Sequence, residues 1–103
     1  MSQIKNLQLR IDVLLAFQVA ILGIVTPNIR GITVKYDNHR IDGLFLFDRP
    51  LNSADTDRVS EVESELCAHF PMHEVEMCAK CCTESDDLNA EILADWVYRR
   101  YED

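Results

Sequence analysis

The stretch Ile11–Val25, IDVLLAFQVAILGIV, is the densest apolar run in the sequence, and it decides the fold. Only Asp12 and Gln18 interrupt it. A membrane-spanning helix needs roughly 20 consecutive apolar residues, so this run is too short. Asp12 at its edge and the lack of a small-residue cleavage site in the following Gly-Ile-Val-Thr-Pro also disfavour a signal peptide. We therefore expect a buried helix and no membrane partner.

Apolar residues recur at helical spacing from the start of the chain, which predicts one helix through this run. The recurring positions are Ile4, Leu7, Ile11, Leu14 or Leu15, Gln18, Ile21 or Leu22, and Val25. From Val13 onward only Gln18 is polar, so we expect this half of the helix to be covered almost all round. Thr26-Pro27 is expected to end the helix, because a residue before proline is pushed out of the helical region.

Residues 32–47 change to a period of two, which predicts a β-hairpin. A four-residue loop, Asp37–Arg40, would pair Tyr36 with Ile41. A two-residue loop would pair Tyr36 with His39 and set two like charges opposite each other, so we favour the longer loop. Both registers place the same set on one face: Ile32, Val34, Tyr36, Ile41, Gly43, Phe45 and Phe47.

The second half of the chain predicts a helix and two strands. Ser53 is the expected N-cap of a helix that runs to about Phe70, with a buried stripe of Val59, Val62, Leu66 and either His69 or Phe70. Residues 75–79 alternate like a strand, and for residues 96–101 we favour a strand over a helix. The sequence therefore predicts one α+β domain over residues 1–103, in the order α-β-β-α-β-β. Its antiparallel-rich sheet is covered by the N-terminal and central helices.

The chain is acidic, with 18 acidic against 10 basic residues and a formal net charge of −8. This balance disfavours nucleic acid and anionic membranes as partners and favours a basic protein. Arg99-Arg100 between two tyrosines is too small a basic patch to change this expectation. Because no credible signal peptide is present, we expect a cytoplasmic protein whose four cysteines are reduced.

A zinc site is the sharpest alternative hypothesis. Cys78 and Cys81 have zinc-ligand spacing, and Cys67, His69 and His73 could complete a tetrahedral site. However, the sequence has no second Cys-x-x-Cys pair, and the two cysteines would point to opposite faces of a continuous strand. We therefore expect no metal and no cofactor, and keep a small zinc-binding module as the alternative.

The sequence carries no catalytic motif. The three glycines stand apart, so there is no glycine-rich phosphate loop. Cys67 and His69 would point in different directions on a helix, which weakens them as a nucleophile and base. We expect no enzyme. The clearest surface feature is instead an acidic row at four-residue spacing, Asp57, Glu61 and Glu65, which a rigid helix could present to a basic partner.

Three segments resemble small acidic immunity proteins of bacterial toxin systems, particularly those of contact-dependent growth inhibition. They are residues 14–37 (LLAFQVAILGIVTPNIRGITVKYD), residues 41–66 (IDGLFLFDRPLNSADTDRVSEVESEL) and residues 96–100 (WVYRR). The most specific piece is Val25–Arg30, VTPNIR. The resemblance covers most of the chain but brings no catalytic residues with it.

The resemblance implies a stoichiometric inhibitor that binds a cognate toxin domain, with a nuclease the expected kind. On the charge pattern we place Asp57, Glu61 and Glu65 in the toxin interface, with Asp55 and Tyr36 nearby. A non-enzymatic adaptor, or a homodimer formed through an exposed edge strand, is a further alternative. The sequence leaves the oligomeric state open.

Overall fold

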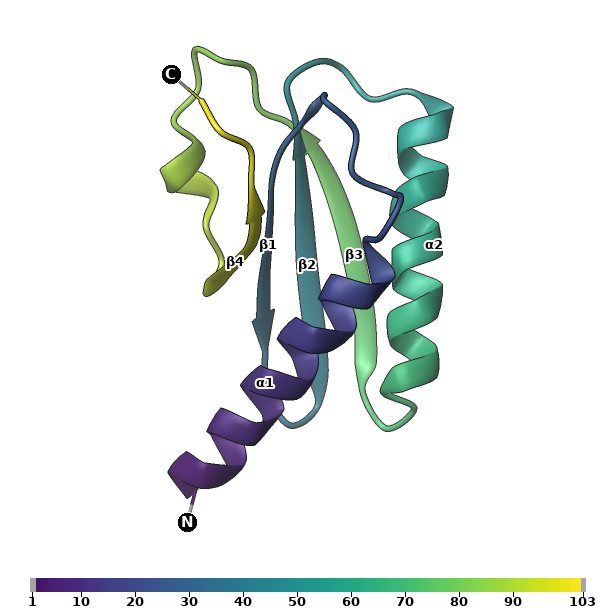
Figure 1. The fold of residues 1–103 in the computed structure, drawn as a ribbon, viewed down its shortest axis with the longest axis vertical. Coiled ribbons are helices and arrows are strands. Elements are labelled where there is room, and N and C mark those ends of the chain that lie inside the picture. Colours follow the sequence, from purple (N-terminus) through teal and green to yellow (C-terminus); the bar gives the residue numbers. More distant parts are fainter. Residues whose placement is uncertain (1, 103) are drawn as a thin grey trace.

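A computed structural model describes residues 2–102, with side chains from Leu7 onward. The described chain forms two helices and a four-stranded sheet in the predicted α-β-β-α-β-β order, with a short 3₁₀ helix before the last strand (Figure 1). The elements are α1 (Ser2–Ala20), β1 (Ile29–Tyr36), β2 (Arg40–Phe47), α2 (Ser53–His69), β3 (Glu74–Cys81), η1 (Leu88–Glu91) and β4 (Asp95–Arg99). The predicted α+β fold class is confirmed.

The strand order in the sheet is β3-β2-β1-β4. The β1–β2 and β1–β4 pairs are antiparallel, whereas β2 and β3 are parallel. Parallel neighbours need a long crossover connection, and α2 supplies it. The sheet is therefore mixed but mostly antiparallel, and the first strand of the hairpin becomes a central strand because β4 returns to lie beside it.

The hairpin has the four-residue loop that the charge argument favoured. Tyr36 pairs with Ile41, and the backbone N–H of Asp37 donates to the carbonyl of Arg40 over 3.0 Å. The Asp37 carboxylate accepts hydrogen bonds from the backbone N–H groups of His39 at 2.7 Å and Arg40 at 2.9 Å. An aspartate that bonds its own following backbone is a common way to stabilise a turn.

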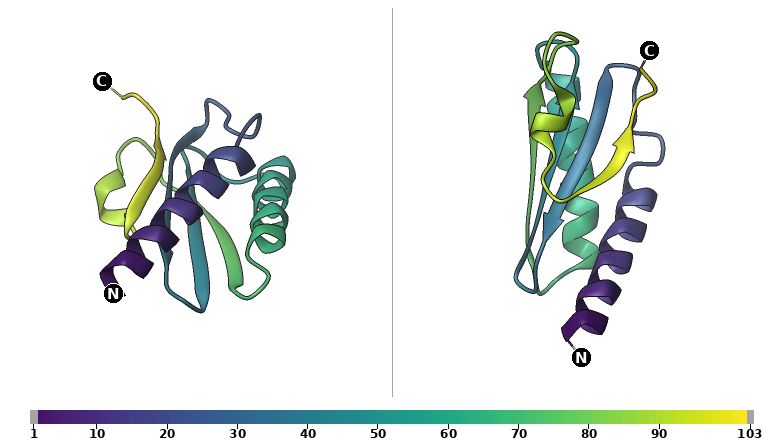
Figure 2. Two further views of the ribbon diagram at one scale, coloured as in Figure 1. Left: turned by 60° about the horizontal axis from the view of Figure 1, so that its bottom comes forward. Right: turned by 90° about the vertical axis from the view of Figure 1, so that its left-hand side faces the viewer.

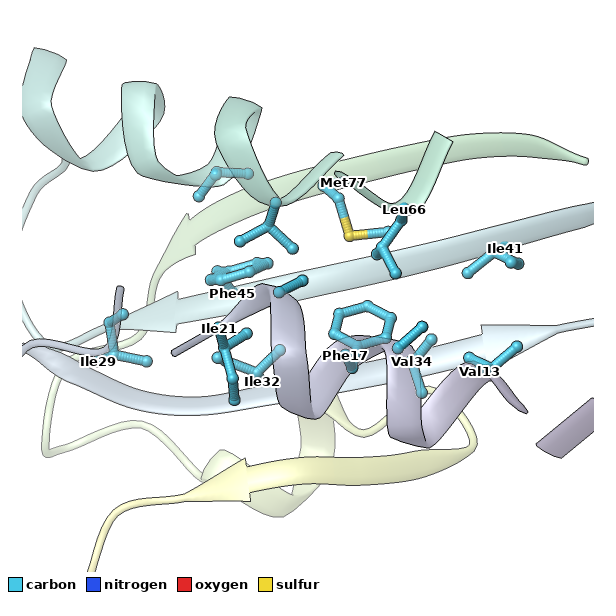
Figure 3. Close-up of a cluster of buried hydrophobic side chains, with 14 of the residues drawn as sticks. Val13, Phe17, Ile21, Ile29, Ile32, Val34, Ile41, Phe45, Leu66 and Met77 are labelled. Atoms are coloured by element: carbon cyan, nitrogen blue, oxygen red, sulfur yellow. The ribbon is translucent and has the colours of Figure 1, made fainter. Parts of the chain in front are cut away.

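Both helices pack on one face of the sheet and share a single core (Figure 3). The sheet side of this core contains the hairpin face predicted above, and α2 contributes Val59, Val62 and Leu66 as expected. Phe70 packs against the core while His69 is exposed. Gly43 leaves room for α1, because a Cβ there would stand only 3.2 Å from Cζ of Phe17.

The inner face of α1 differs from the predicted one. The residues buried against the sheet are Val13, Ala16, Phe17, Ala20 and Ile21. Of the row predicted to be buried, Ile21 is buried and Leu14 and Val25 pack against the core, but Leu7, Ile11 and Gln18 are exposed. The side chain of Ile4 lies outside the described residues. The expectation of almost complete cover from Val13 onward is also wrong. In Figure 2 (right), no other described segment lies outside α1.

The helix α1 ends at Ala20, five residues before the expected end. Gly23 follows in the left-handed region, with φ = 77°, and the N–H of Ile24 donates to the carbonyl of Ile21 over 2.9 Å. Glycine adopts this conformation without the cost that a Cβ imposes, and it commonly closes helices this way. Among the described residues, no helix is both long and apolar enough to cross a membrane.

Candidate functional site: the outer helical face

The acidic stripe of α2 consists of Asp57, Glu61 and Glu65. All three side chains are exposed and lie on the side of α2 away from its buried residues. Ser60 and Ser64 lie on the same surface. Among the described side chains, no lysine, arginine or histidine forms an ion pair with any of the three carboxylates. The stripe therefore presents its negative charge to solvent without internal compensation.

The N-terminus of α2 is fixed by a capping box. Asn52 is the N-cap rather than Ser53: its side chain accepts from the N–H of Asp55 at 2.9 Å, and Asp55 accepts from the N–H of Asn52 at 3.1 Å. Arg49 donates two hydrogen bonds to Asp55, the shorter at 2.6 Å, and they lower the pKa of this carboxyl. Asp55 is fully buried, at 0% exposure, so it is not part of the exposed stripe.

Glu63 has a structural contact as well. Its carboxylate accepts a hydrogen bond from the backbone N–H of Met77 in β3 over 2.9 Å. β3 is an edge strand, and an unpaired edge N–H needs a partner. Glu63 therefore ties the middle of α2 to the sheet, while its neighbours in the acidic stripe remain free to meet a partner.

Tyr36 lies apart from the acidic stripe. It sits at the end of β1 and donates a hydrogen bond from its hydroxyl to Asp95 of β4 over 2.7 Å, and Arg10 of α1 donates to the same carboxylate. Burial, followed by the hydrogen bond to Asp95, raises the pKa of Tyr36 to about 12. α2 packs on β3, at the opposite edge of the sheet from β4, so the structure does not bring Tyr36 and the stripe together.

The outer side of α1 carries the largest feature that the sequence reasoning missed. Five large apolar residues, named here the apolar ridge, point away from the core: Leu7 (54% exposed), Ile11 (41%), Leu15 (61%), Val19 (57%) and Leu22 (75%). Four of them follow each other at four-residue spacing, which forms a continuous ridge on a helix. Contiguous exposed apolar surface of this kind marks interaction sites more often than isolated exposed leucines do.

The apolar ridge reaches the end of α2, one helical turn beyond the acidic stripe. A shallow groove between the helices is lined by Leu15 and Val19 of α1 and by His69 and Phe70 at the end of α2. His69 is exposed and follows Glu65 by four residues, so it continues the row of the acidic stripe to the groove. We call the ridge and the stripe together the outer helical face, because both lie on the side of the helical layer that faces away from the sheet.

The segment VTPNIR contributes a buried arginine. Arg30 is 4% exposed, and its guanidinium holds Glu102 through two hydrogen bonds of 2.8 and 2.9 Å. It also donates to backbone carbonyls of the loop after β3, including that of Thr83 at 2.7 Å. Arg100, from the WVYRR segment, donates to Asp48 at 2.7 Å and to Glu102 at 2.9 Å. The two arginines hold the pKa of Glu102 at about 2. We name this group the arginine clamp.

The VTPNIR and WVYRR segments of the resemblance therefore meet at Glu102, although Arg30 and Arg100 lie about 70 residues apart in the chain. A protein-family model described as "MafI2 immunity protein" matches residues 10–102, which include the sheet, α2 and most of α1. The chain belongs to the MafI2 immunity protein family. This membership confirms the resemblance to toxin-neutralising immunity proteins and implies a cognate toxin as partner. No curated protein matches the chain.

The cysteines of this MafI2-family chain do not form a cluster with the histidines. Cys78 is exposed on the polar face of β3, while Cys81 is half-buried and Cys82 is buried on the far side of the sheet from the helices. Within the described residues, no group of three or more His, Cys, Asp or Glu side chains could hold a metal ion. The five residues of the zinc hypothesis are spread over α2, the following turn and β3.

Proposed function

We propose that this immunity protein neutralises a nuclease toxin in the cytoplasm by binding it one to one and covering its active site or substrate surface. We also propose that the toxin belongs to a contact-dependent growth inhibition system. The immunity protein catalyses nothing in this scheme; it acts by occupancy. The observation that carries the proposal is the acidic stripe, three uncompensated carboxylates on one rigid helix.

A nuclease must attract a polyanion, so the surface around its active site is basic. Residues four apart on a helix are separated by about 6 Å along its axis, so the stripe offers evenly spaced negative charges over two turns. The formal net charge of −8 adds a long-range attraction to a basic partner. Asp55 and Tyr36 are left out of this surface, because Asp55 is buried and Tyr36 bonds to Asp95 of β4, the edge strand farthest from α2.

The test is the double variant Asp57→Lys/Glu61→Lys against the cognate toxin domain, inactivated for handling. At low salt we expect association to slow at least about tenfold and to depend less on salt, because complementary charge acts mainly on the association rate. Both substituted side chains are exposed, so the unfolding midpoint should change little.

The control is Glu74→Lys/Glu84→Lys, which makes the same change in net charge at two highly exposed residues outside α2. A purely non-specific charge effect would slow both double variants equally. Unchanged affinity and unchanged salt dependence in Asp57→Lys/Glu61→Lys would remove the acidic stripe from the toxin interface. In cells that express the active toxin, the stripe variant should protect growth less well than the control.

A further inference from the structure

We infer that the apolar ridge of α1 is the water-excluding centre of the toxin interface and that the acidic stripe of α2 forms its rim. This inference rests on the proposed function and adds the chemistry of the partner. The toxin surface that fits carries an apolar patch beside a basic one. Known interfaces have this organisation, in which an apolar centre is surrounded by polar groups that remain in contact with water.

The apolar ridge is surplus to the core. α1 already buries a complete inner face against the sheet, with Val13 and Phe17 at 0% exposure. Four ridge residues lie on the opposite side of the same helix and Leu22 lies in the turn that follows it; all five keep between 41% and 75% of their surface in water. A helix that is apolar on every side is normally covered on every side. Something outside the described chain therefore completes the cover of α1.

Continuity with the acidic stripe identifies the occupant. The ridge and the stripe lie in one helical layer, and Leu15 and Val19 of the ridge share a groove with His69 and Phe70 at the end of α2. A protein that covers the ridge and this groove therefore reaches His69, which lies one helical turn from Glu65. Such a partner gains if its own neighbouring surface is basic, and loses if that surface is acidic.

This charge argument disfavours a second copy of the chain on the ridge. Two copies joined by a two-fold axis use the same patch on both partners. Each copy carries a formal charge of −8 and an uncompensated acidic stripe beside the patch, so two copies would bring like charges into one interface. A nuclease toxin carries the opposite, basic charge around its active site and is therefore attracted to the same surface.

The spacing of the ridge residues also favours a helix as the partner element. Four ridge residues lie at four-residue spacing, and ridges of this type pack into the grooves of another helix at a crossing angle of about 50°. A partner helix with small or apolar side chains on one face would meet this geometry. Large apolar residues near the middle of such a contact are expected to dominate the dissociation rate.

The experiment measures the binding kinetics of Leu15→Glu with the inactivated cognate toxin domain. We expect dissociation at least tenfold faster than for wild type and association within about threefold of it. Leu93→Glu is the matched control: it makes the same chemical change at a leucine that is 36% exposed in the segment before β4. It should bind like wild type. Leu15→Ala/Val19→Ala repeats the test without added charge.

The outcomes separate the two proposals. If the wild-type protein does not bind the toxin domain, the proposed function fails. If the wild type binds, and both ridge variants dissociate at the wild-type rate with unchanged unfolding midpoints, the inference fails alone. Sedimentation of the protein without toxin supplies the third arm. A dimer that Leu15→Glu dissociates would make the ridge a contact between copies and overturn the inference. A monomer supports it.

Discussion

The two helices cover the same sheet face, yet the outer side of α2 is polar whereas the outer side of α1 is apolar. α2 buries one stripe, turns carboxylates and serines to solvent, and begins with a capping box. α1 buries its inner face equally well but leaves leucine, isoleucine and valine exposed, with no acidic residue in its first turn. Both helices bury an apolar face in the core, so packing in the core does not explain why their outer sides differ in composition. The outer side of α1 is composed for a contact that the isolated chain does not make.

The largest expected effect contrasts the two sides of α1. Phe17→Ala removes a fully buried ring over Gly43 and should lower the free energy of unfolding by about 3–5 kcal/mol. Leu15→Ala, two residues away on the apolar ridge, should change it by less than about 0.5 kcal/mol. Urea unfolding of the two variants measures the contrast. Equal losses would show that the ridge is packed in the free protein, which would end the comparison.

A second contrast lies within α2. Asp55→Ala removes the reciprocal partner of Asn52 and leaves Arg49 without its carboxylate, so we expect a loss of about 1–3 kcal/mol. Asp57→Ala removes an exposed carboxylate with no ion pair among the described side chains and should stay within about 0.5 kcal/mol. If the two variants lost the same stability, the division between a structural and a surface carboxylate would be wrong.

Acid should reveal the same buried carboxylate. The pKa of Asp55 is lowered in the folded state by Arg49, so its contribution to stability is present above the usual aspartate pKa of about 4 and is lost as the pH falls below it. The unfolding free energy of the wild type should therefore fall more steeply from pH 5 to pH 3 than that of Asp55→Asn. Glu102, whose pKa is about 2, contributes equally to both proteins. Parallel curves would contradict the assignment.

The smallest expected effect concerns the end of α1. Gly23→Ala should cost about 1 kcal/mol, because a Cβ at φ = 77° strains the backbone, while no atom within 4 Å would be displaced. Gly23→Asn should cost less, since asparagine tolerates the left-handed region better than alanine. Thermal unfolding of the two variants checks the order. The reverse order would mean that the turn does not fix where α1 ends.

The sequence predicted those parts of the fold in which polar and apolar residues alternate. The face and register of the hairpin and the buried stripe of α2 are correct because a wrong phase would bury charges. α1 offers no such constraint: from Val13 onward both sides are apolar, so periodicity alone cannot choose Phe17 over Leu15 as the inner residue. The parallel pairing of β3 with β2 is a tertiary choice that no local pattern records.

The sequence also could not show which of the acidic residues of α2 are buried. Asp55 and Asp57 look alike in the sequence, but only the contact with Arg49 and the capping box shows that Asp55 is buried. Asn52 and Ser53 are both good N-caps, so residue preference could not separate them. The apolar ridge does have a signal in the sequence, because the uncharged run is too long for one buried face. The helical periodicity nevertheless predicts that the whole run lies in the core.

The arginine clamp also limits the order in which contacts can form while the protein folds. Arg30 lies in the first strand, but its carboxylate partner is 72 residues further along the chain and its carbonyl partners are more than 50 residues further along. Until Glu102 has emerged from the ribosome, Arg30 lacks that carboxylate partner. The central strand β1 likewise lacks one of its two neighbouring strands until β4 has been synthesised. Folding during synthesis therefore cannot complete this cluster until Glu102 has emerged.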